Sequence, residues 1–424
     1  MRSAIDPARY NFVPGATGPL VVGGEGSYLL TADGRRILDA AGGAIVANIG
    51  HGRSEVADAV RDAMANGGYT VPIWPTPHRL ELLDRLTHDW LPDGFEHVFF
   101  TSGGSESADS AIRLARAYQL SVGRPERWKV VGRHPSYHGM TLGSLAMGSH
   151  SSRRAGYEPL LLEFPKVPWD DADAVVRLIE QEDPATIAGF VFEPVTGAAG
   201  ACLVASDRYW RTVEEVCRAH DIVLIADEVM TGFGRCGTRW GHEQFPITPD
   251  VIYGGKGLGG GYVPIGMLAT TARIADPLAR VGAFMFFTFT GNDGACAGAS
   301  KVLEILTSEA LVERSARMGA LLGERLHDAL DDHPNVLEVR GRGLFQGIEL
   351  VHDRGSERRY PAEAQVATAV SRRCLEQDVW VYPAGSGPVQ DALMLGCPFI
   401  ITDEEIDRIV STLRDGIDVI CGVV

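Results

Sequence analysis

The chain has 424 residues, of which 45% are hydrophobic and 22% charged, as expected for a globular protein of about two to three domains. Its net charge of −16 argues against nucleic acid and anionic membrane surfaces as partners, because both attract clustered basic residues. The seven scattered cysteines disfavour a disulfide framework or a zinc site, and neither an apolar leader nor a run of membrane-spanning length is seen, so we expect a cytoplasmic protein.

The N-terminal part predicts short strands followed by two helices. Residues 18–50 alternate apolar runs with turns, and the Asp-Gly pair within residues 31–36 indicates a hairpin. One helix is predicted from Ser54, as its N-cap, to Gly67, and a second over residues 77–91.

Residues 97–120 predict a strand, a Gly-Gly turn and a helix that begins at Ser105. A helix N-terminus after a glycine turn favours an anion, because its free N–H groups and its dipole point outward. Seen alone, the same pattern also fits a plain strand-to-helix turn capped by Ser105.

The middle of the chain places polar residues after apolar runs. A strand near Val130 precedes Tyr137, His138 and Gly139, whose tyrosine either packs in the loop or stacks on a flat ligand. After a helix over residues 172–181, a buried strand ends at Glu193, because the following proline cannot continue a central strand. Glu193 is either an ion-paired carboxylate or part of a crevice at this edge. A helix over residues 207–220 then leads to the next strand.

Two further strand-like runs end beside a carboxylate and a lysine. Residues 222–226 run into Asp227, and Val251–Tyr253 run into Gly254, Gly255 and Lys256. In an open α/β sheet the ligand crevice lies at the carboxyl ends of the strands. A desolvated lysine loses its proton readily, as a Schiff-base nucleophile requires. From this stretch alone, an ordinary loop lysine is an equally good interpretation.

The C-terminal third predicts a smaller α+β module. It consists of a long amphipathic helix over residues 310–333, two strands within 336–351, a helix near 362–377 and a last helix from Thr402. We expect this module to pack with the N-terminal strands.

The stretch DEVMTGFGRCG, then PDV, then GGKGLGGGYVPIG, resembles the signature of class III aminotransferases, which are pyridoxal-phosphate (PLP) enzymes of fold type I. The resemblance implies an α/β fold with a large domain, residues 61–304, built on a mixed, mostly parallel seven-stranded sheet flanked by helices. A smaller α+β domain would come from both chain ends, residues 1–60 and 305–424.

The resemblance also assigns roles to single residues. Lys256 would form the Schiff base with PLP, and Asp227 would pair with the pyridine nitrogen. The remaining cofactor contacts would come from residues that match the family at the phosphate, the ring and the pocket wall: Gly104, Ser105, Tyr137, His138, Glu193 and Val229. Val229 would lie on the same side as Asp227 if the strand continues. Thr288 would reach the PLP phosphate of the partner subunit, so the resemblance implies a homodimer with shared active sites.

The chain departs from the family pattern at several positions. Ser102 and Gly103 replace an asparagine and a serine near the phosphate, Thr196 replaces a glutamine, and Asp293 replaces a proline. No arginine occurs between Val379 and Thr402, where many relatives bind a substrate carboxylate. Arg53 and Arg79 are the candidate replacements.

We therefore predict an omega-type transaminase that moves an amino group from an amine or ω-amino acid to an oxo acid such as pyruvate, with no metal. Two alternatives stay open: an aminomutase or epimerase of the same family, and a non-catalytic protein of the same fold. A nicotinamide-binding interpretation of GLGGG is excluded, because no helix pattern opens after those glycines.

Overall fold

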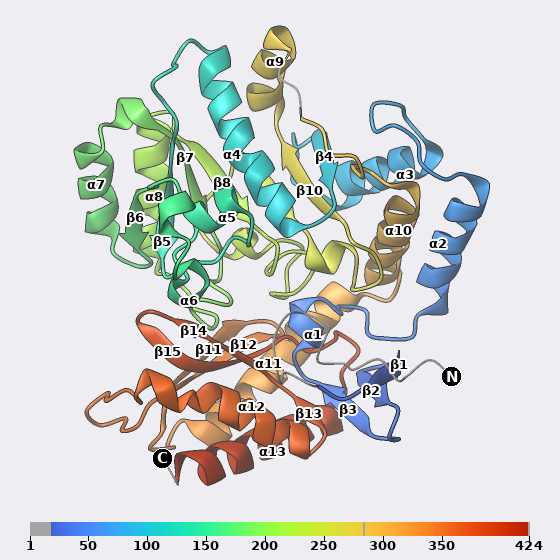
Figure 1. Cartoon of the computed structure of the whole chain (residues 1–424), viewed down its shortest axis with the longest axis vertical. Coiled ribbons are helices and arrows are strands. Elements are labelled where there is room, and N and C mark those ends of the chain that lie inside the picture. The colour runs from blue at the N-terminus through green and yellow to red at the C-terminus, as the bar shows by residue number, and fades with distance from the viewer. Residues whose placement is uncertain (1–17, 283–284, 423–424) are drawn as a thin grey trace.

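The computed structural model describes residues 18–282 and 285–422. Part of the predicted small domain, residues 1–17, therefore lies outside the described residues. The chain forms a larger upper region around one sheet and a smaller lower region around two (Figure 1).

The large region is built on a seven-stranded sheet of order β4-β10-β9-β8-β7-β5-β6. Neighbouring strands are parallel from β9 to β6, whereas β10 runs antiparallel to both β9 and β4. This is the predicted mixed, mostly parallel sheet. Its strands span the following ranges: β4 His97–Thr101, β5 Lys129–His134, β6 Lys166–Pro168, β7 Ile187–Phe192, β8 Val223–Asp227, β9 Val251–Gly254 and β10 Gly266–Thr270.

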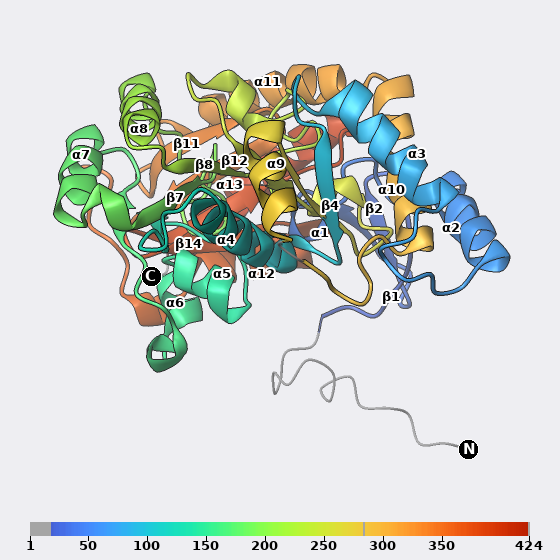
Figure 2. The same ribbon diagram turned by 90° about the horizontal axis from the view of Figure 1, so that it is seen from above.

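Alternate residues of the central strands face opposite helix layers. In β8, Val223 and Ile225 join a core cluster with residues of α4 (Gly104–Ser121), whereas Leu224 and Ala226 join a cluster with residues of α8 (Asp207–Ala219). Figure 2 shows α4 and α8 on opposite sides of the strands. Because side chains alternate along a strand, Asp227 faces the α4 side and the next residue faces away from it.

Further helices surround the large sheet, and α10 packs against α2 and α3 at one end. Their ranges are α1 Gly42–Ile45, α2 Ser54–Asn66, α3 Pro77–Arg85, α5 Leu142–Met147, α6 Ser151–Arg154, α7 Ala172–Gln181, α9 Ala272–Val281 and α10 Asp293–Ser308. Short π and 3-10 turns add η2 Leu86–Trp90, η3 Glu158–Leu160, η4 Pro184–Thr186, η5 Gly241–Gln244, η6 Lys256–Leu258 and η7 Ala362–Ala364.

Both chain ends form the lower region, as predicted. One sheet has the order β1-β2-β3-β13 and joins N-terminal strands to a C-terminal one, and the other, antiparallel sheet has the order β11-β12-β15-β14. The strands are β1 Val21–Glu25, β2 Tyr28–Thr31, β3 Arg36–Asp39, β11 Val336–Arg342, β12 Phe345–Leu350, β13 Val379–Trp380, β14 Tyr382–Ser386 and β15 Val389–Leu395. The helices are α11 Leu311–Leu330, α12 Val366–Glu376 and α13 Asp403–Cys421.

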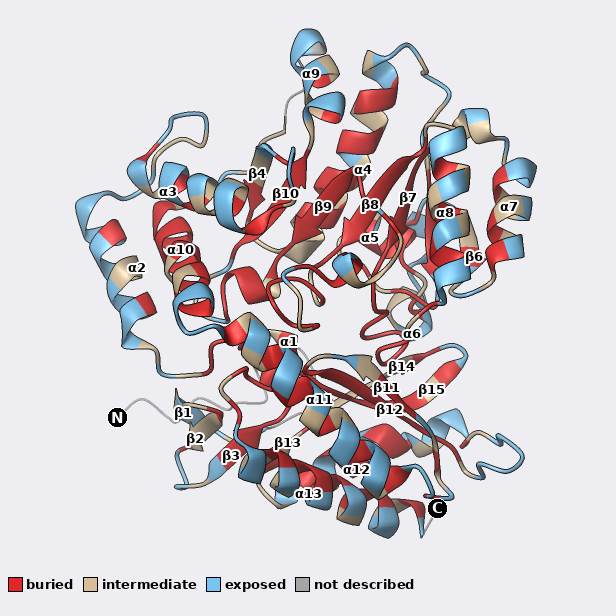
Figure 3. Ribbon diagram, turned by 180° about the vertical axis from the view of Figure 1, so that it is seen from behind, coloured by how far each residue is buried: buried red, intermediate tan, exposed pale blue. Residues whose placement is uncertain are grey.

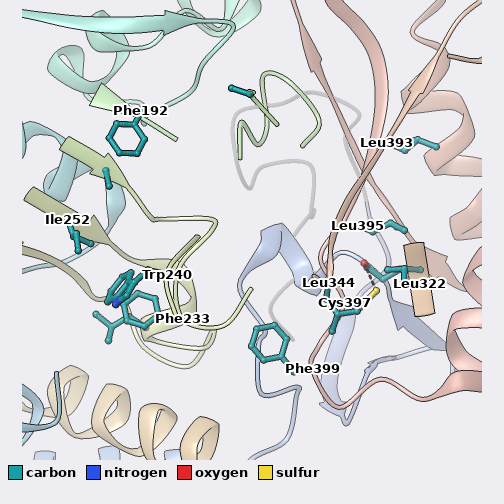
Figure 4. Close-up of a cluster of buried hydrophobic side chains, with 14 of the residues drawn as sticks. Phe192, Phe233, Trp240, Ile252, Leu322, Leu344, Leu393, Leu395, Cys397 and Phe399 are labelled. Carbon is teal, nitrogen blue, oxygen red and sulfur yellow. Dashed lines mark hydrogen bonds between the residues drawn. The ribbon is translucent and has the colours of Figure 1, made fainter. Parts of the chain in front are cut away.

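The two regions share one apolar core. Phe192 and Ile252 of the large sheet belong to the same buried cluster as Leu393 and Leu395 of the lower one (Figure 4). Figure 3 shows buried residues running through the strands of both regions. The predicted domain boundaries at 60/61 and 304/305 fall inside α2 and α10, and this division stays a prediction.

Most predicted elements are present, including the hairpin of β2 and β3. One detail is wrong: α2 begins at Ser54, so Arg53 is the N-cap and provides no side-chain cap. Thr402, in contrast, caps α13 with a full capping box.

All seven cysteines are buried and free. No helix within residues 18–282 and 285–422 is both long and apolar enough to cross a membrane.

Candidate active site

A cavity of about 220 Å³ opens where parallel strands of the large sheet end. Its walls come from the segments that directly follow β4, β5, β7, β8 and β9. Eight of the nine predicted site residues line it: Gly104, Ser105, Tyr137, His138, Glu193, Asp227, Val229 and Lys256. The fold thus brings these residues, which are distant in the sequence, to one edge of the sheet, where ligands bind in open α/β folds.

Asp227 lies at the end of β8 and is buried. Its Oδ2 is 2.7 Å from Nδ1 of His138, and its Oδ1 accepts a hydrogen bond of 3.0 Å from the N–H of Val229. The other ring nitrogen of His138, Nε2, is buried without a partner among the described residues. β8 stops at Asp227, so the expected continuation of the strand is wrong. Val229 reaches the cavity through a turn instead.

The next residue, Glu228, faces the opposite side and is fully buried. Its Oε1 accepts hydrogen bonds of 2.8 Å from both the backbone N–H and Nδ1 of His242. Its Oε2 accepts from the N–H of Gly241, at 2.9 Å, and from the hydroxyl of Thr231. The fold thus satisfies this carboxylate completely.

Lys256 follows β9, and its amine is the only nucleophile that the sequence predicts. Its φ of 35° lies in the left-handed region, which a non-glycine residue rarely adopts. Burial lowers the pKa of Lys256, and the negative charges of Asp227 and Glu193 offset this only in part. The amine lines the cavity without a hydrogen bond to any described residue, and its desolvation favours the neutral form that a nucleophile needs.

The N-terminus of α4 meets the lysine loop through two glycines. A side chain on Gly104 would place its Cβ 2.9 Å from a methyl group of Val229, and one on Gly255 would lie 3.2 Å from the backbone nitrogen of Gly104. Only glycine allows this close approach. The helix begins at Gly104, with Gly103 as N-cap, and the Ser105 hydroxyl accepts a hydrogen bond of 3.2 Å from the N–H of Met140.

Glu193 holds the loop that carries Tyr137. Its Oε1 accepts a hydrogen bond of 3.0 Å from the Tyr137 N–H, and its Oε2 accepts one of 2.9 Å from Gly197. Burial raises the pKa of Glu193. The Tyr137 ring packs edge-on against His150, with centroids 5.9 Å apart, and Arg153 lies over it with Cζ 5.0 Å from the centroid.

Thr288 is the one predicted residue that the fold does not bring to this cavity. It is exposed and lies beside Tyr69, Phe289 and Asp293 in a separate hollow. Its predicted contact with a partner subunit stays a prediction.

Both arginines that were suggested for binding a substrate carboxylate are already bonded to other groups of the chain. Arg79 is buried and donates to the carbonyl oxygens of Thr70, Val71, Trp74 and Gly291. Arg53 makes a bidentate pair with Glu309, at 2.7 and 2.8 Å.

Two departures from the family pattern have local explanations. Asp293 lies in the first turn of α10 and accepts a hydrogen bond of 2.5 Å from the Thr76 hydroxyl. Thr196 does not line the cavity, because its side chain packs towards Gly200 and Leu203, and its neighbour Val195 lines the wall instead.

Five residues in or beside the site were not predicted: Gly139, Val195, Met230 and Thr231, which line the cavity, and Arg153, which lies over the Tyr137 ring. The first four lie within two residues of predicted ones, so the motif positions could have indicated them. Arg153 has no such signal, because it reaches the site from a four-residue helix sixteen positions after Tyr137.

Comparison with known proteins gives one family. A family profile described as "Aminotransferase class-III" matches residues 16–417. A hypotaurine/taurine–pyruvate aminotransferase of Paracoccus denitrificans is 32% identical over 93% of this chain and 90% of its own, and an omega-aminotransferase of Caulobacter vibrioides is 31% identical over 92% and 91%. A crystal structure of a thermostable (S)-enantioselective omega-transaminase from Thermomicrobium roseum superposes with a TM-score of 0.90, at 33% identity over 97% of this chain and 96% of that one.

Proposed function

The chain belongs to the class-III aminotransferases and is a transaminase, and from this premise we propose that it uses PLP to move an amino group from an amine or ω-amino acid to an oxo acid such as pyruvate. One observation carries this proposal. A half-buried lysine of lowered pKa and a histidine-paired carboxylate line the same cavity, although they follow different strands.

The residues around the cavity suit this cofactor. The first turn of α4 presents free N–H groups for a phosphate, and Gly104 lets this turn pack closely on Val229. Tyr137 offers a flat aromatic ring, and Asp227 offers a negative charge for a ring nitrogen. The unpaired Lys256 amine is available for covalent attachment.

When bound, PLP supplies an aldehyde that takes up the amino group and a cationic ring that accepts electrons from the breaking C–H bond. Lys256 would hold the cofactor through Nζ, and the same amine, when free, would serve as the base and acid that moves the proton of the substrate carbon. His138 orients the carboxylate of Asp227, which would keep the proton on the ring nitrogen of the cofactor. Donor and acceptor would use the site in turn, which predicts ping-pong kinetics.

We further propose a homodimer in which Thr288 completes the partner's phosphate site. Large apolar side chains are exposed around it: Tyr69 (57%), Ile73 (68%), Trp74 (63%) and Phe289 (62%). A cluster of this kind is typical of an interface. The seven free, buried thiols support a reducing, cytoplasmic location.

The test is to incubate the purified, PLP-loaded protein with a panel of amines and pyruvate. We expect stoichiometric alanine and carbonyl product, and initial rates that give parallel double-reciprocal lines. Product formation that needs no oxo acid would favour the aminomutase or epimerase alternative, and an absence of any amine-dependent spectral change would contradict the proposal. Light scattering of the same sample should give twice the mass of 45.7 kDa.

A further inference from the structure

Arg153 is a half-buried arginine at the site without an acceptor. Its Nε is buried and has no hydrogen-bond partner, and its guanidinium forms no ion pair or hydrogen bond with any residue in the described part of the chain. A guanidinium has five N–H donors, and leaving them unused at a partly desolvated position costs free energy. An acceptor from outside the chain would remove this cost.

Neighbouring arginines show how the fold normally satisfies this group. Arg154, the next residue, donates to the carbonyl oxygens of Leu145, Ala146 and Gly148. Arg133, buried behind the same loop, donates to the carbonyl oxygens of Glu193 and Trp169. Arg153 differs from both, since its guanidinium donates to no described residue and lies over the face of the Tyr137 ring.

The position of Arg153 is within electrostatic reach of the reacting groups. Tyr137 lines the cavity, and the Arg153 Cζ is 5.0 Å from its ring centroid. Burial lowers the pKa of Lys256, and the positive charge of Arg153 lowers it further. The guanidinium therefore places a positive charge close to the cavity, next to the wall formed by Tyr137.

The helix that carries Arg153 is fixed to the lower region. The backbone N–H of Ser151 donates to the hydroxyl of Ser386 at 2.8 Å, and the two hydroxyls are 2.9 Å apart. Figure 1 shows α6 directly above β14, between the two regions of the molecule. Ser386 ends β14, which belongs to the segment 379–402 that contains no arginine. The helix α6, which carries Arg153, thus lies beside residues 379–402, the segment that contains no arginine.

We propose that Arg153 binds the acid group of the oxo-acid acceptor, and of the amino acid formed from it, by charge-assisted hydrogen bonds. This inference rests on the proposed transaminase function, and it narrows the acceptors to small molecules that carry a carboxylate or a similar planar acid group. The guanidinium matches such a group with two parallel N–H donors.

The competing explanation is that Arg153 only holds the Tyr137 ring in place. A structural role of this kind would affect all acceptors equally, whereas an acid-binding role affects only charged ones. Pyruvate and propanal separate the two explanations, because both are three-carbon carbonyl compounds and only pyruvate is an anion.

The experiment measures the second half-reaction of the PLP-loaded enzyme, after pre-amination with an amine, for pyruvate and for propanal. In Arg153→Met we expect kcat/KM for pyruvate to fall about 10- to 100-fold, chiefly through KM, which is the effect of losing a hydrogen bond to a charged group. The value for propanal should stay within about threefold. Arg153→Lys should recover part of the loss for pyruvate, because it keeps the charge but not the paired donors.

A matched control is Arg211→Met, which removes the same charge from an exposed position on α8. This variant should leave kcat/KM for pyruvate and for propanal unchanged. A second readout is the Kd of propanoate, an unreactive acid, measured by calorimetry with the PLP-loaded protein, and Arg153→Met should weaken it by the same factor as pyruvate. If Arg153→Met does not fold, the same comparison with Arg153→Lys decides the question.

Equal losses for pyruvate and propanal, or unchanged propanoate binding in the variant, would overturn the assignment of Arg153. Failure of the proposed function looks different: the wild-type protein would transfer no amino group to pyruvate, while Arg153-dependent propanoate binding would still be measurable.

Discussion

Asp227 and Glu228 are adjacent buried carboxylates, each paired with a histidine, yet the fold treats them in opposite ways. Glu228 receives four hydrogen bonds from Thr231, Gly241 and His242, which fill both of its oxygens. Asp227 receives one from Val229 and one from His138 and keeps a side open to the cavity. Because side chains alternate along β8, the side chain of Asp227 faces the cavity, whereas that of Glu228 faces the opposite side of the sheet.

Two half-buried lysines, Lys166 and Lys256, show the same contrast. Lys166 donates to the carbonyl oxygens of Ala146 and Phe164, at 3.0 and 2.7 Å, so its ammonium is satisfied inside the fold. Lys256 has no such bond to a described residue and faces the cavity. A buried polar group whose hydrogen bonds are all made within the fold serves the structure, whereas one that lacks such partners is available to a ligand. Burial and a lowered pKa alone do not distinguish a lysine that is hydrogen-bonded within the fold from one that is open to a ligand.

The largest effect should come from removing the open lysine. Lys256→Met should lower transamination at least about 1,000-fold, because both covalent attachment and proton transfer are lost. The visible absorbance of bound PLP should disappear as well, as measured by spectrophotometry. Lys166→Met is the control and should keep the absorbance, and a Lys256 variant with substantial turnover would remove the contrast between the two lysines.

The open carboxylate should come next. Asp227→Asn preserves shape but removes the charge that holds a ring proton, so we expect kcat to fall by about 100-fold, the size of one strong charge-assisted hydrogen bond. The melting temperature should change little, because only two hydrogen bonds are affected. Steady-state kinetics and calorimetry measure the two quantities, and full activity in this variant would refute the role of Asp227.

Glu228, whose two carboxylate oxygens are fully hydrogen-bonded, should affect stability more than activity. Glu228→Gln places an NH₂ group against N–H and O–H donors in a buried site, and we expect the free energy of unfolding to fall by about 2–3 kcal/mol. Activity per folded molecule should change by less than about threefold. Urea unfolding followed by circular dichroism gives the first quantity, and a large loss of activity without loss of stability would show that Glu228 belongs to the site.

The smallest effect concerns the pH dependence of stability at Lys166. Burial lowers the pKa of Lys166 to about 7, against 10.5 for the free side chain. Above about pH 7 the unfolded chain therefore binds more protons than the folded one, so the stability should rise with pH. Lys166→Met should flatten this rise in urea unfolding between about pH 7 and 8, where the cysteines of the unfolded chain are still mostly protonated. An unchanged slope would contradict the lowered pKa.

The site could be predicted from sequence where its residues follow strands. Asp227, Glu193 and Lys256 each come at or just after an apolar run, and parallel strands bring such ends to one edge. Arg153 could not be found in this way, because a four-residue helix has no periodicity and its place depends on the contact between Ser151 and Ser386.

The fold was predictable to a similar degree. Amphipathic helices such as α7 and α11 show a clear polar face, and their predicted ranges are close to the observed ones. α10 was not predicted, because its first two turns are buried on all sides and consist of small residues without a polar stripe. The antiparallel strand β10 was also missed, since Gly266–Thr270 is a short, fully buried run that periodicity cannot assign.

The burial of every cysteine makes the folded protein inert to thiol reagents. Burial raises the pKa of Cys374 to about 12, and that of Cys296 to about 12, so neither accessibility nor ionisation favours labelling. Because these two residues lie on α10 and α12, in different regions of the molecule, the rate at which each becomes alkylated would time the local opening of its own region.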